Sequence, residues 1–168
     1  MRVTVTKITD EKLMQLACSF TINKESKMPL ERIYQCKHSP IRALIFVVEM
    51  YDIPTFVSVH LTRHSLGVTH YVKSNREDRM GYSGDLGRMQ PVNHMMFINA
   101  EALINMAHKR LCSKTHKLTT EVMQLIKEAV AQVDPALAKY MVRQCEYLNG
   151  RCDELRCCGN IYVPTKEV

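Results

Sequence analysis

Two adjacent residues, Arg63 and His64, stand where a short predicted helix ends. A charged, glycine-containing segment with no apolar periodicity runs from there to Arg88. A compact domain rarely keeps a long irregular segment that has no function. Guanidinium groups form paired hydrogen bonds with phosphate and carboxylate oxygens, so this segment predicts a site for an anionic ligand. The residues alone leave a second interpretation open, in which Arg63 and His64 only cap the helix.

Asn99 and Arg110 form a second candidate pair, inside a helix predicted over residues 95–112. Their spacing of eleven residues (110 − 99) is close to three helical turns. Both side chains are therefore predicted on one side of the helix, where together they could hold one long ligand. The alternative is that Asn99 caps the helix locally and Arg110 lies in solvent.

The elements that must position these residues follow from the hydrophobic pattern. Runs of β-branched residues predict strands, and apolar residues spaced three or four apart predict helices. The run 42–51 is nearly continuously apolar, which predicts a strand buried on both faces. The predicted order is strand 2–8, helix 10–19, helix 29–36, strand 42–51, helix 52–64, strand 68–72, helix 95–112, helix 119–132 and helix 134–143.

Acidic residues mark several predicted helix starts. Asp52 precedes Pro54 by two residues, and proline suits a first helical turn because its fixed φ fits and its missing N–H is not needed there. Asp134-Pro135 repeats this pattern. Asp10 is predicted to cap the first helix. The residues of that helix predicted to face the core are Leu13, Leu16 and Ala17.

Length and composition exclude several classes of protein. A chain of 168 residues with a hydrophobic fraction of 46% fits one domain with a normal core. The sequence has no run of about 18 apolar residues, and residues 1–12 have no apolar signal-peptide core, so we expect a cytoplasmic protein. The net charge of +6 suits either a nucleic acid or a small phosphorylated ligand.

Four of the seven cysteines lie in a C-terminal tail, residues 144–168. An odd number of cysteines in a protein expected in the cytoplasm favours thiols or a metal site over a disulfide scaffold. The thiolates of Cys145, Cys152, Cys157 and Cys158 are a candidate set for tetrahedral zinc, and three of them with Cys36 or His38 form an alternative set. Free or disulfide-prone thiols and an iron–sulfur cluster are the other interpretations.

Several segments taken together resemble the flavin-dependent thymidylate synthase family. The signature of that family is R-H-R-x-x-S-x-N-E-x-S-x-R-Y. This chain begins it with Arg63-His64, and has Ser74-Asn75 and Arg79 in place of the later Ser-Asn and Arg. The remaining similarities are Arg88 with Pro91, His38-Ser39-Pro40, Asp52-Ile53-Pro54, the spacing of Asn99 and Arg110, and Glu121-Val122, so that the resemblance spans residues 18–142.

The resemblance implies an α+β fold, a small mixed or antiparallel sheet packed with several helices, in a single catalytic domain over residues 1–143. It implies reductive methylation of dUMP to dTMP with methylenetetrahydrofolate and NADPH, in a homotetramer whose active sites are shared between chains. FAD would be bound by Arg63, His64, Asn99 and Arg110. The nucleotide would be bound by Ser74, Asn75, Arg79 and Arg88, and the catalytic groups would be Arg63, Arg79 and Arg88.

The chain departs from the family pattern: its signature is stretched, the loop that follows is shorter, and three residues differ. Ser65 stands where the signature has its second Arg, Met80 where it has Tyr, and Met123 where an Arg follows Glu-Ile. Two alternatives therefore stay open. One is a relative that modifies another pyrimidine nucleotide, for example by hydroxymethylation. The other is a non-catalytic protein of the same fold that binds nucleic acid, whose binding would depend strongly on salt.

Overall fold

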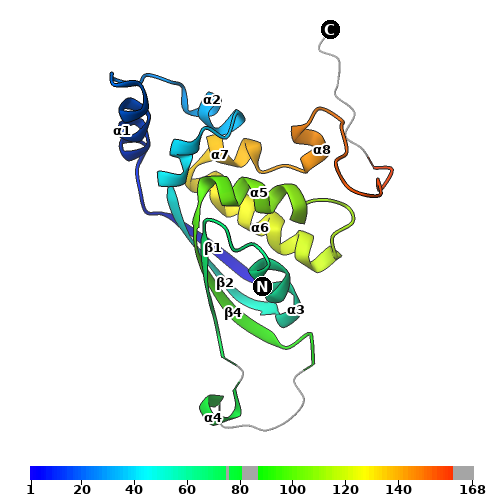
Figure 1. Ribbon diagram of the computed structural model, residues 1–168. Coiled ribbons are helices and arrows are strands. Elements are labelled where there is room, and N and C mark those ends of the chain that lie inside the picture. Colours follow the sequence, from blue (N-terminus) through cyan, green and yellow to red (C-terminus); the bar gives the residue numbers. More distant parts are fainter. Residues whose placement is uncertain (75, 81–86, 161–168) are drawn as a thin grey trace.

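A four-stranded antiparallel sheet forms the centre of the molecule (Figure 1). Its strands are β1 (Arg2–Lys7), β2 (Ile45–Pro54), β3 (Val68–Val72) and β4 (Pro91–Asn99), in the order β1-β2-β4-β3. The computed structural model describes residues 1–74, 76–80 and 87–160. Among the residues expected to form the site, Asn75 lies outside these ranges. The expected α+β fold with an antiparallel sheet in a single domain is confirmed.

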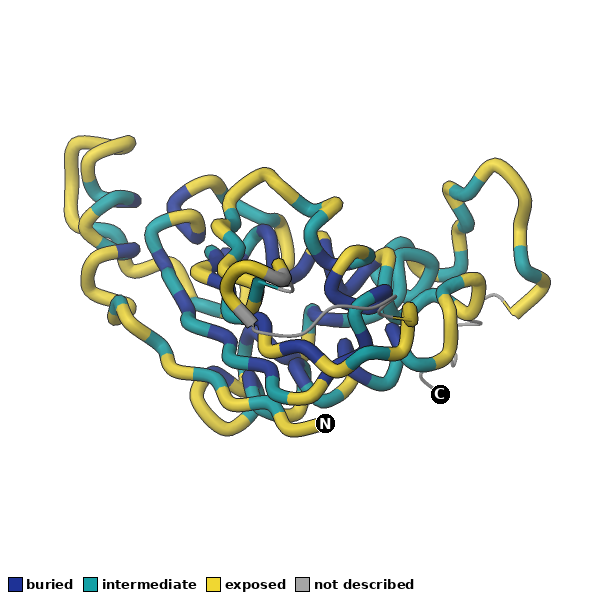
Figure 2. Tube along the Cα trace, turned by 90° about the horizontal axis from the view of Figure 1, so that it is seen from below, coloured by how far each residue is buried: buried dark blue, intermediate teal, exposed yellow. Residues whose placement is uncertain are grey.

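Helices cover one face of this sheet. One long helix, α6, packs along β1, and α7 packs against α6. Buried residues lie in the middle of the molecule, and the chain at its two outer ends is mainly exposed (Figure 2). Within the described ranges, no helix is both long and apolar enough to cross a membrane. The helices are α1 (Glu11–Ile22), α2 (Leu30–Gln35), the 3-10 helix η1 (Ser39–Ala43), α3 (Thr55–Thr62), α4 (Glu77–Met80), α5 (Ala100–Arg110), α6 (Lys117–Val133), α7 (Pro135–Tyr140) and α8 (Gln144–Tyr147).

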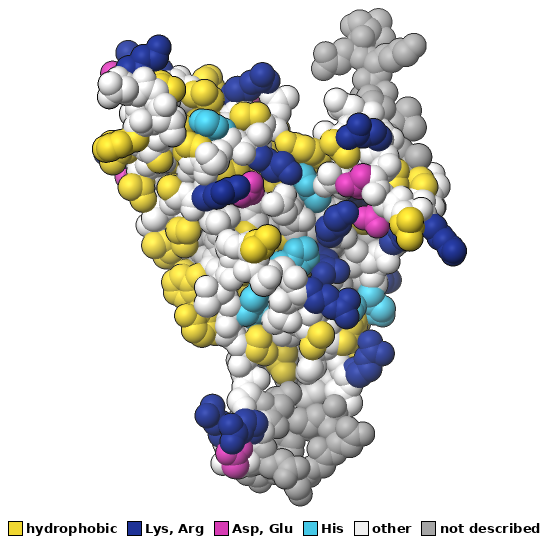
Figure 3. All heavy atoms as spheres, viewed as in Figure 1, with side chains coloured by type: hydrophobic (Ala, Val, Ile, Leu, Met, Phe, Trp, Pro, Cys, Tyr) yellow, Lys and Arg dark blue, Asp and Glu magenta, His cyan; other side chains and the backbone are white. Residues whose placement is uncertain are grey.

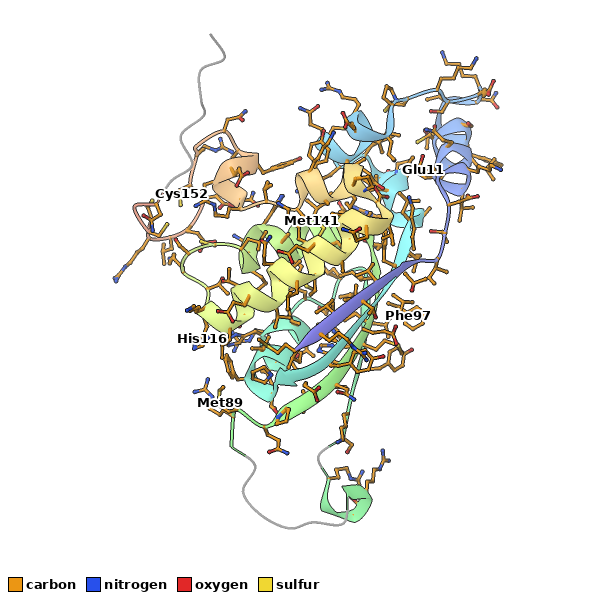
Figure 4. All side chains as sticks on the ribbon, turned by 180° about the vertical axis from the view of Figure 1, so that it is seen from behind. Glu11, Met89, Phe97, His116, Met141 and Cys152 are labelled. Carbon is orange, nitrogen blue, oxygen red and sulfur yellow. The ribbon has the colours of Figure 1, made fainter. Side chains whose placement is uncertain are left out.

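Strand β2 is buried on one face only, so the prediction of a strand buried on both faces was wrong. Phe46, Val48 and Met50 are buried under the helices, and the residues between them are only partly buried. The opposite face of the sheet has no helical cover among the described residues. Phe97 of β4 projects from that face and is 41% exposed (Figure 4). Antiparallel sheets commonly leave one face open in this way.

The helix predicted over residues 95–112 was wrong for residues 95–99, which belong to strand β4. Helix α5 begins only at Ala100. Met96 and Ile98 alternate on the buried face of the sheet, where they pair with β2. This long-range pairing overrides a local pattern that also fits a helix. The side chain of Asn99 accepts a hydrogen bond from the N–H of Ala102 at 2.9 Å. Asn99 is therefore the cap of α5, as the local alternative held.

Asp52 lies at a bulge in β2 instead of capping α3, which corrects the sequence prediction. Its φ is 57°, and the pairing of β2 with β4 shifts at this point. The strand continues through Pro54, and α3 begins immediately after it. The predicted end of this helix is confirmed, because α3 ends at Thr62 and is followed by Arg63 and His64.

Helix α1 begins after Asp10, as predicted, and its cap is the side chain of Asp10. The buried residues of α1 are Met14 and Cys18, whereas Leu13 and Leu16 are 45% and 53% exposed. The inward direction predicted for both leucines was wrong. This helix lies at the edge of the molecule and packs mainly against η1 (Figure 1), so only a narrow stripe of it is covered.

Asp134 joins three elements inside the molecule. It is 2% exposed, and its carboxylate accepts hydrogen bonds from Lys7 Nζ and Tyr34 Oη, both at 2.7 Å. It also accepts from the N–H of Leu137 at 2.9 Å, which confirms the predicted cap at the start of α7. Burial, followed by the bond to Asp134, raises the pKa of Tyr34, so the phenol keeps the proton that it donates.

Candidate functional site

A basic cavity opens beside the C-terminal end of α3. Its volume is about 400 Å³, and the end of α5 and the segment between α5 and α6 complete its walls. Lys, Arg and His side chains gather on this part of the surface (Figure 3). The lining side chains of these types are His60, Arg63, His64, Lys109, Arg110, Lys114 and His116.

Arg110 is held in place by α3. Its Nε donates to His64 Nε2 at 2.9 Å, and its Nη2 donates to the backbone carbonyl of His60 at 2.7 Å. Because His64 Nε2 accepts, the ring of His64 must be neutral. Burial, then the charge of Arg110, lowers the pKa of His64 to about 4, which agrees with this assignment. The alternative in which Arg110 lies in solvent was therefore wrong, because Arg110 is held by two hydrogen bonds and is partly buried in the cavity wall.

The cavity carries positive charge that carboxylates do not balance. Arg63 and Arg110 line the same cavity, and burial, then the charge of Arg63, lowers the pKa of Arg110. Of the lysines, Lys109 is paired with Glu154 at 2.8 Å. Within the ranges that the structure describes, no ion pair joins Arg63, Arg110 or Lys114 to a carboxylate. An anion is the natural partner for such a group.

Arg88 lies in the same neighbourhood. Its guanidinium lies 5.6 Å from the ring centroid of Phe56, and that ring meets His60 edge-on at 5.5 Å. Burial lowers the pKa of His60 first, and Arg110, Arg63 and Arg88 are among the charges that lower it further. The N–H of Phe56 donates to the carbonyl of Arg88 at 3.2 Å. This hydrogen bond holds the backbone of Arg88 against the first turn of α3.

The structure thus brings four of the predicted site residues together, and separates the others from them. The group around the end of α3 is Arg63, His64, Arg88 and Arg110. Asn99 caps the opposite end of α5 and lines a different cavity, so it does not share a ligand site with Arg110 within one chain. Ser74 follows β3, and Arg79 belongs to α4, which lies at the bottom of the molecule (Figure 1).

A chain of hydrogen-bonded side chains links the backbone at His64 to strands β3 and β4. His70 Nε2 lies 2.7 Å from the carbonyl oxygen of His64, so this nitrogen carries the proton. His70 Nδ1 lies 2.9 Å from His94 Nε2, and His94 Nδ1 lies 3.0 Å from Ser58 Oγ, so hydrogen bonds join the three side chains. Burial, then the neighbouring His70, lowers the pKa of His94 to about 4. These hydrogen bonds connect the end of α3 to β3 and β4.

Gly67 holds the segment after α3 against the start of α5. Its carbonyl accepts from the N–H of Asn99 at 2.9 Å, its φ is +73°, and an added Cβ would lie 2.4 Å from Asn99 Nδ2. We expect Gly67→Ala to reduce the free energy of unfolding by about 1–3 kcal/mol, measured by urea denaturation. The matched control is Gly87→Ala, where the added Cβ meets nothing within 4 Å. Equal stabilities of the two variants would contradict this strain.

The predicted zinc set of Cys145, Cys152, Cys157 and Cys158 is not assembled. Cys157 is exposed, and all seven cysteines are free thiols. In the described part of the chain, no three His, Cys, Asp or Glu side chains are placed so that they could hold a metal ion as they stand. The tail instead docks on the end of α5, where Lys114 Nζ also donates to the carbonyl of Arg156 at 2.8 Å.

Sequence reasoning missed several residues of the basic cavity. His60 is the one with a usable signal, because it lies three and four residues before Arg63 and His64 and so shares their helical face. Lys109 directly precedes Arg110 at a helix C-terminus, where cations are favoured. Glu154 had no signal, since it comes from the tail, 45 residues away from Lys109.

Comparison with known proteins adds one finding. No protein-family model matches the sequence, and no curated protein matches it either. Solved structures do match. The flavin dependent thymidylate synthase ThyX from Helicobacter pylori, complexed with FAD and dUMP, has a TM-score of 0.69 at 13% sequence identity, over 85% of this chain and 100% of that chain. The chain has the fold of these synthases.

A second crystal structure of Thymidylate Synthase X from Helicobacter pylori, with FAD and dUMP, has the same TM-score of 0.69 at 12% identity. That comparison covers 84% of this chain and 99% of the other. The ThyX-like fold expected from the sequence motifs is therefore present, although the similarity lies below what matching by sequence detects.

Proposed function

We propose that the chain is a flavin-dependent enzyme of the thymidylate synthase type. It binds FAD and dUMP and catalyses the reductive methylation of dUMP to dTMP, with methylenetetrahydrofolate and NADPH as co-substrates. One observation carries this proposal. Arg63 and Arg110 line one cavity with the neutral ring of His64, neither is ion-paired to a carboxylate among the described residues, and the fold is that of proteins solved with FAD and dUMP.

The donors present fit a phosphorylated ligand. A guanidinium group has five N–H donors, and Arg110 uses two of them on His64 and His60. The remaining N–H groups of Arg110, with those of Arg63, are available for phosphate oxygens. Because α3 already fixes the orientation of Arg110, little side-chain freedom is lost when the anion binds.

The cavity is small for the whole of a dinucleotide. Its volume of about 400 Å³ lies toward the lower end of the range of ligand sites, about 300–1,000 Å³. We therefore propose that other chains of a homotetramer supply the rest of the site. Ser74 and Arg79 do not line the cavity of their own chain, and in this proposal they reach the cavity of a neighbouring chain.

The flavin would supply the hydride chemistry, and the protein would supply binding and charge. His64 and Arg110 would hold the cofactor at the end of α3. Arg63 and Arg88 would donate hydrogen bonds to phosphate and pyrimidine carbonyl oxygens. Donors fixed in advance toward an oxygen that gains negative charge lower the barrier of such a reaction.

The test is a flavin titration followed by an assay with dUMP. We expect the purified protein to retain about one FAD per chain after gel filtration, measured by visible absorbance. It should then release tritium from dUMP labelled at C5 when methylenetetrahydrofolate and NADPH are present, and chromatography should identify dTMP. The matched control is Arg32→Ala, which removes an exposed Arg on α2 far from the cavity and should change neither result.

Two other outcomes would replace this proposal. Flavin binding with a product other than dTMP would indicate modification of another pyrimidine nucleotide, which Ser65 favours because it removes a guanidinium from the family's signature. A colourless protein that binds nucleic acid with a steep salt dependence would indicate that the basic surface serves nucleic acid instead.

A further inference from the structure

The first part of the C-terminal tail lies against the basic cavity. We call residues 150–158, which follow α8, the tail strap, and Cys152 marks the strap in Figure 4. Glu154 lies in the middle of the strap and lines the basic cavity. Among the described residues, it is the one acidic side chain in that lining. The strap therefore brings a negative charge to a wall made otherwise of basic and neutral groups.

The strap engages both lysines of the cavity wall. Lys109 Nζ lies 2.8 Å from Glu154 Oε1 and 3.9 Å from Asp153 Oδ2. Lys114 Nζ donates to the backbone carbonyl of Arg156 at 2.8 Å. Each ammonium has three N–H donors, so each gives at least one of them to the strap.

The carboxylate of Glu154 carries its full charge near neutral pH. The hydrogen bond from Lys109, and then the charge of Lys109, lowers the pKa of Glu154, and the charge of Lys114 lowers it further. The same hydrogen bond raises the pKa of Lys109. An ionised carboxylate at this place binds the ammonium groups that would attract a phosphate, and it repels the phosphate itself.

The contacts that hold the strap are weak enough to exchange with a ligand. The side chains of Lys109 and Glu154 are 46% and 30% exposed, and such partly exposed ion pairs contribute only about 0.2–1 kcal/mol. Leu155, between Glu154 and Arg156, is 100% exposed, so its apolar side chain adds no packing. Segments with few buried apolar contacts open at low cost in free energy.

We propose that the tail strap is an autoinhibitory contact, in which the carboxylate of Glu154 competes with an anionic ligand for the ammonium of Lys109. A phosphorylated ligand that enters the cavity takes over Lys109, and the strap moves away from the end of α5. No covalent bond forms or breaks. The full chain then binds its ligand more weakly than the same cavity would without Glu154. This inference rests on the anion site of the proposed function and adds its regulation.

The first test is calorimetric titration of the full chain with inorganic pyrophosphate at low salt. Glu154→Gln keeps the size of the side chain and removes its charge, so we expect about two- to fivefold tighter binding. Glu154→Lys should bind more tightly still, because it replaces a repulsion by an attraction. The matched control is Glu128→Gln, which removes an exposed carboxylate of α6 outside the cavity lining and should leave the affinity unchanged.

A second test uses the unmodified protein. Trypsin cuts the peptide bond whose carbonyl belongs to Arg156, and Lys114 holds that carbonyl in the closed strap. Saturating pyrophosphate should therefore speed cleavage after Arg156. Cleavage after Lys27, in the exposed segment that follows α1, should keep its rate. Slower cleavage after Arg156 would mean that the strap closes over the ligand, which would overturn the proposal.

The remaining outcomes separate this inference from the proposed function. Equal or weaker pyrophosphate binding by Glu154→Gln would overturn the inference, as would absence of binding to both proteins. Tighter binding by Glu154→Gln in a chain that retains no FAD would support the inference and count against the flavin enzyme. Retained FAD with no effect of Glu154→Gln would do the reverse.

Discussion

Arg110→Ala is expected to weaken binding of FAD or dUMP by about 10- to 100-fold. A hydrogen bond to a charged group contributes about 1.5–3 kcal/mol, and Arg110 faces the cavity with its orientation already fixed by His64 and His60. The affinity would be measured by equilibrium dialysis with each ligand separately. Catalytic turnover of dUMP should fall with the weakened ligand.

Two further variants separate charge from geometry at this position. Arg110→Lys keeps the positive charge but loses the planar fork, so it should give an intermediate affinity. Arg32→Ala removes an exposed Arg elsewhere and should bind as the unchanged protein does. If Arg110→Ala binds both ligands within about twofold of the unchanged protein while remaining folded, the basic cavity is not the phosphate site.

Asp134→Ala is expected to reduce the free energy of unfolding by about 3–5 kcal/mol. The substitution leaves the ammonium of Lys7 and the phenol of Tyr34 without their acceptor in a site where Asp134 is 2% exposed. Breaking a buried charge pair by removing one partner has an effect of this size. It also removes the cap of α7, which adds about 1 kcal/mol to the loss.

The measurement is urea denaturation followed by circular dichroism. Asp78→Ala is the matched control, since Asp78 forms its ion pair with Arg76 on the surface, with side chains 60% and 64% exposed. That variant should lose less than about 1 kcal/mol. A loss of similar size in both variants would show that burial of Asp134 adds nothing to stability.

Features fixed by local chemistry were the ones that the sequence could predict. Asp10 and Asp134 cap their helices because an aspartate beside the first turn can satisfy a backbone N–H wherever that helix packs. The end of α3 at Arg63 was found for a similar reason, since cations are favoured there. These signals lie within a few residues of the structure that they predict.

Features fixed by distant packing were not predictable. The continuous apolar run 95–98 fits either a helix or a strand, and only pairing with β2 decides between them. The position of Asp52 before Pro54 is typical of a helix cap, but Asp52 lies in the bulge where β2 pairs with β4. For the same reason, the sequence grouped Asn99 with Arg110, although they lie at opposite ends of α5.

The half-buried histidines at the end of α3 add little to the positive charge of the basic cavity near neutral pH. Burial and neighbouring cations lower the pKa of both His60 and His64, to about 4 for His64, so neither adds positive charge near neutral pH. The attraction for anions comes from guanidinium and ammonium groups, which keep their protons throughout this range. A phosphate monoester gains its second negative charge near pH 6. If the proposed ligand is a phosphate monoester, its second ionisation strengthens its attraction to these guanidinium and ammonium groups.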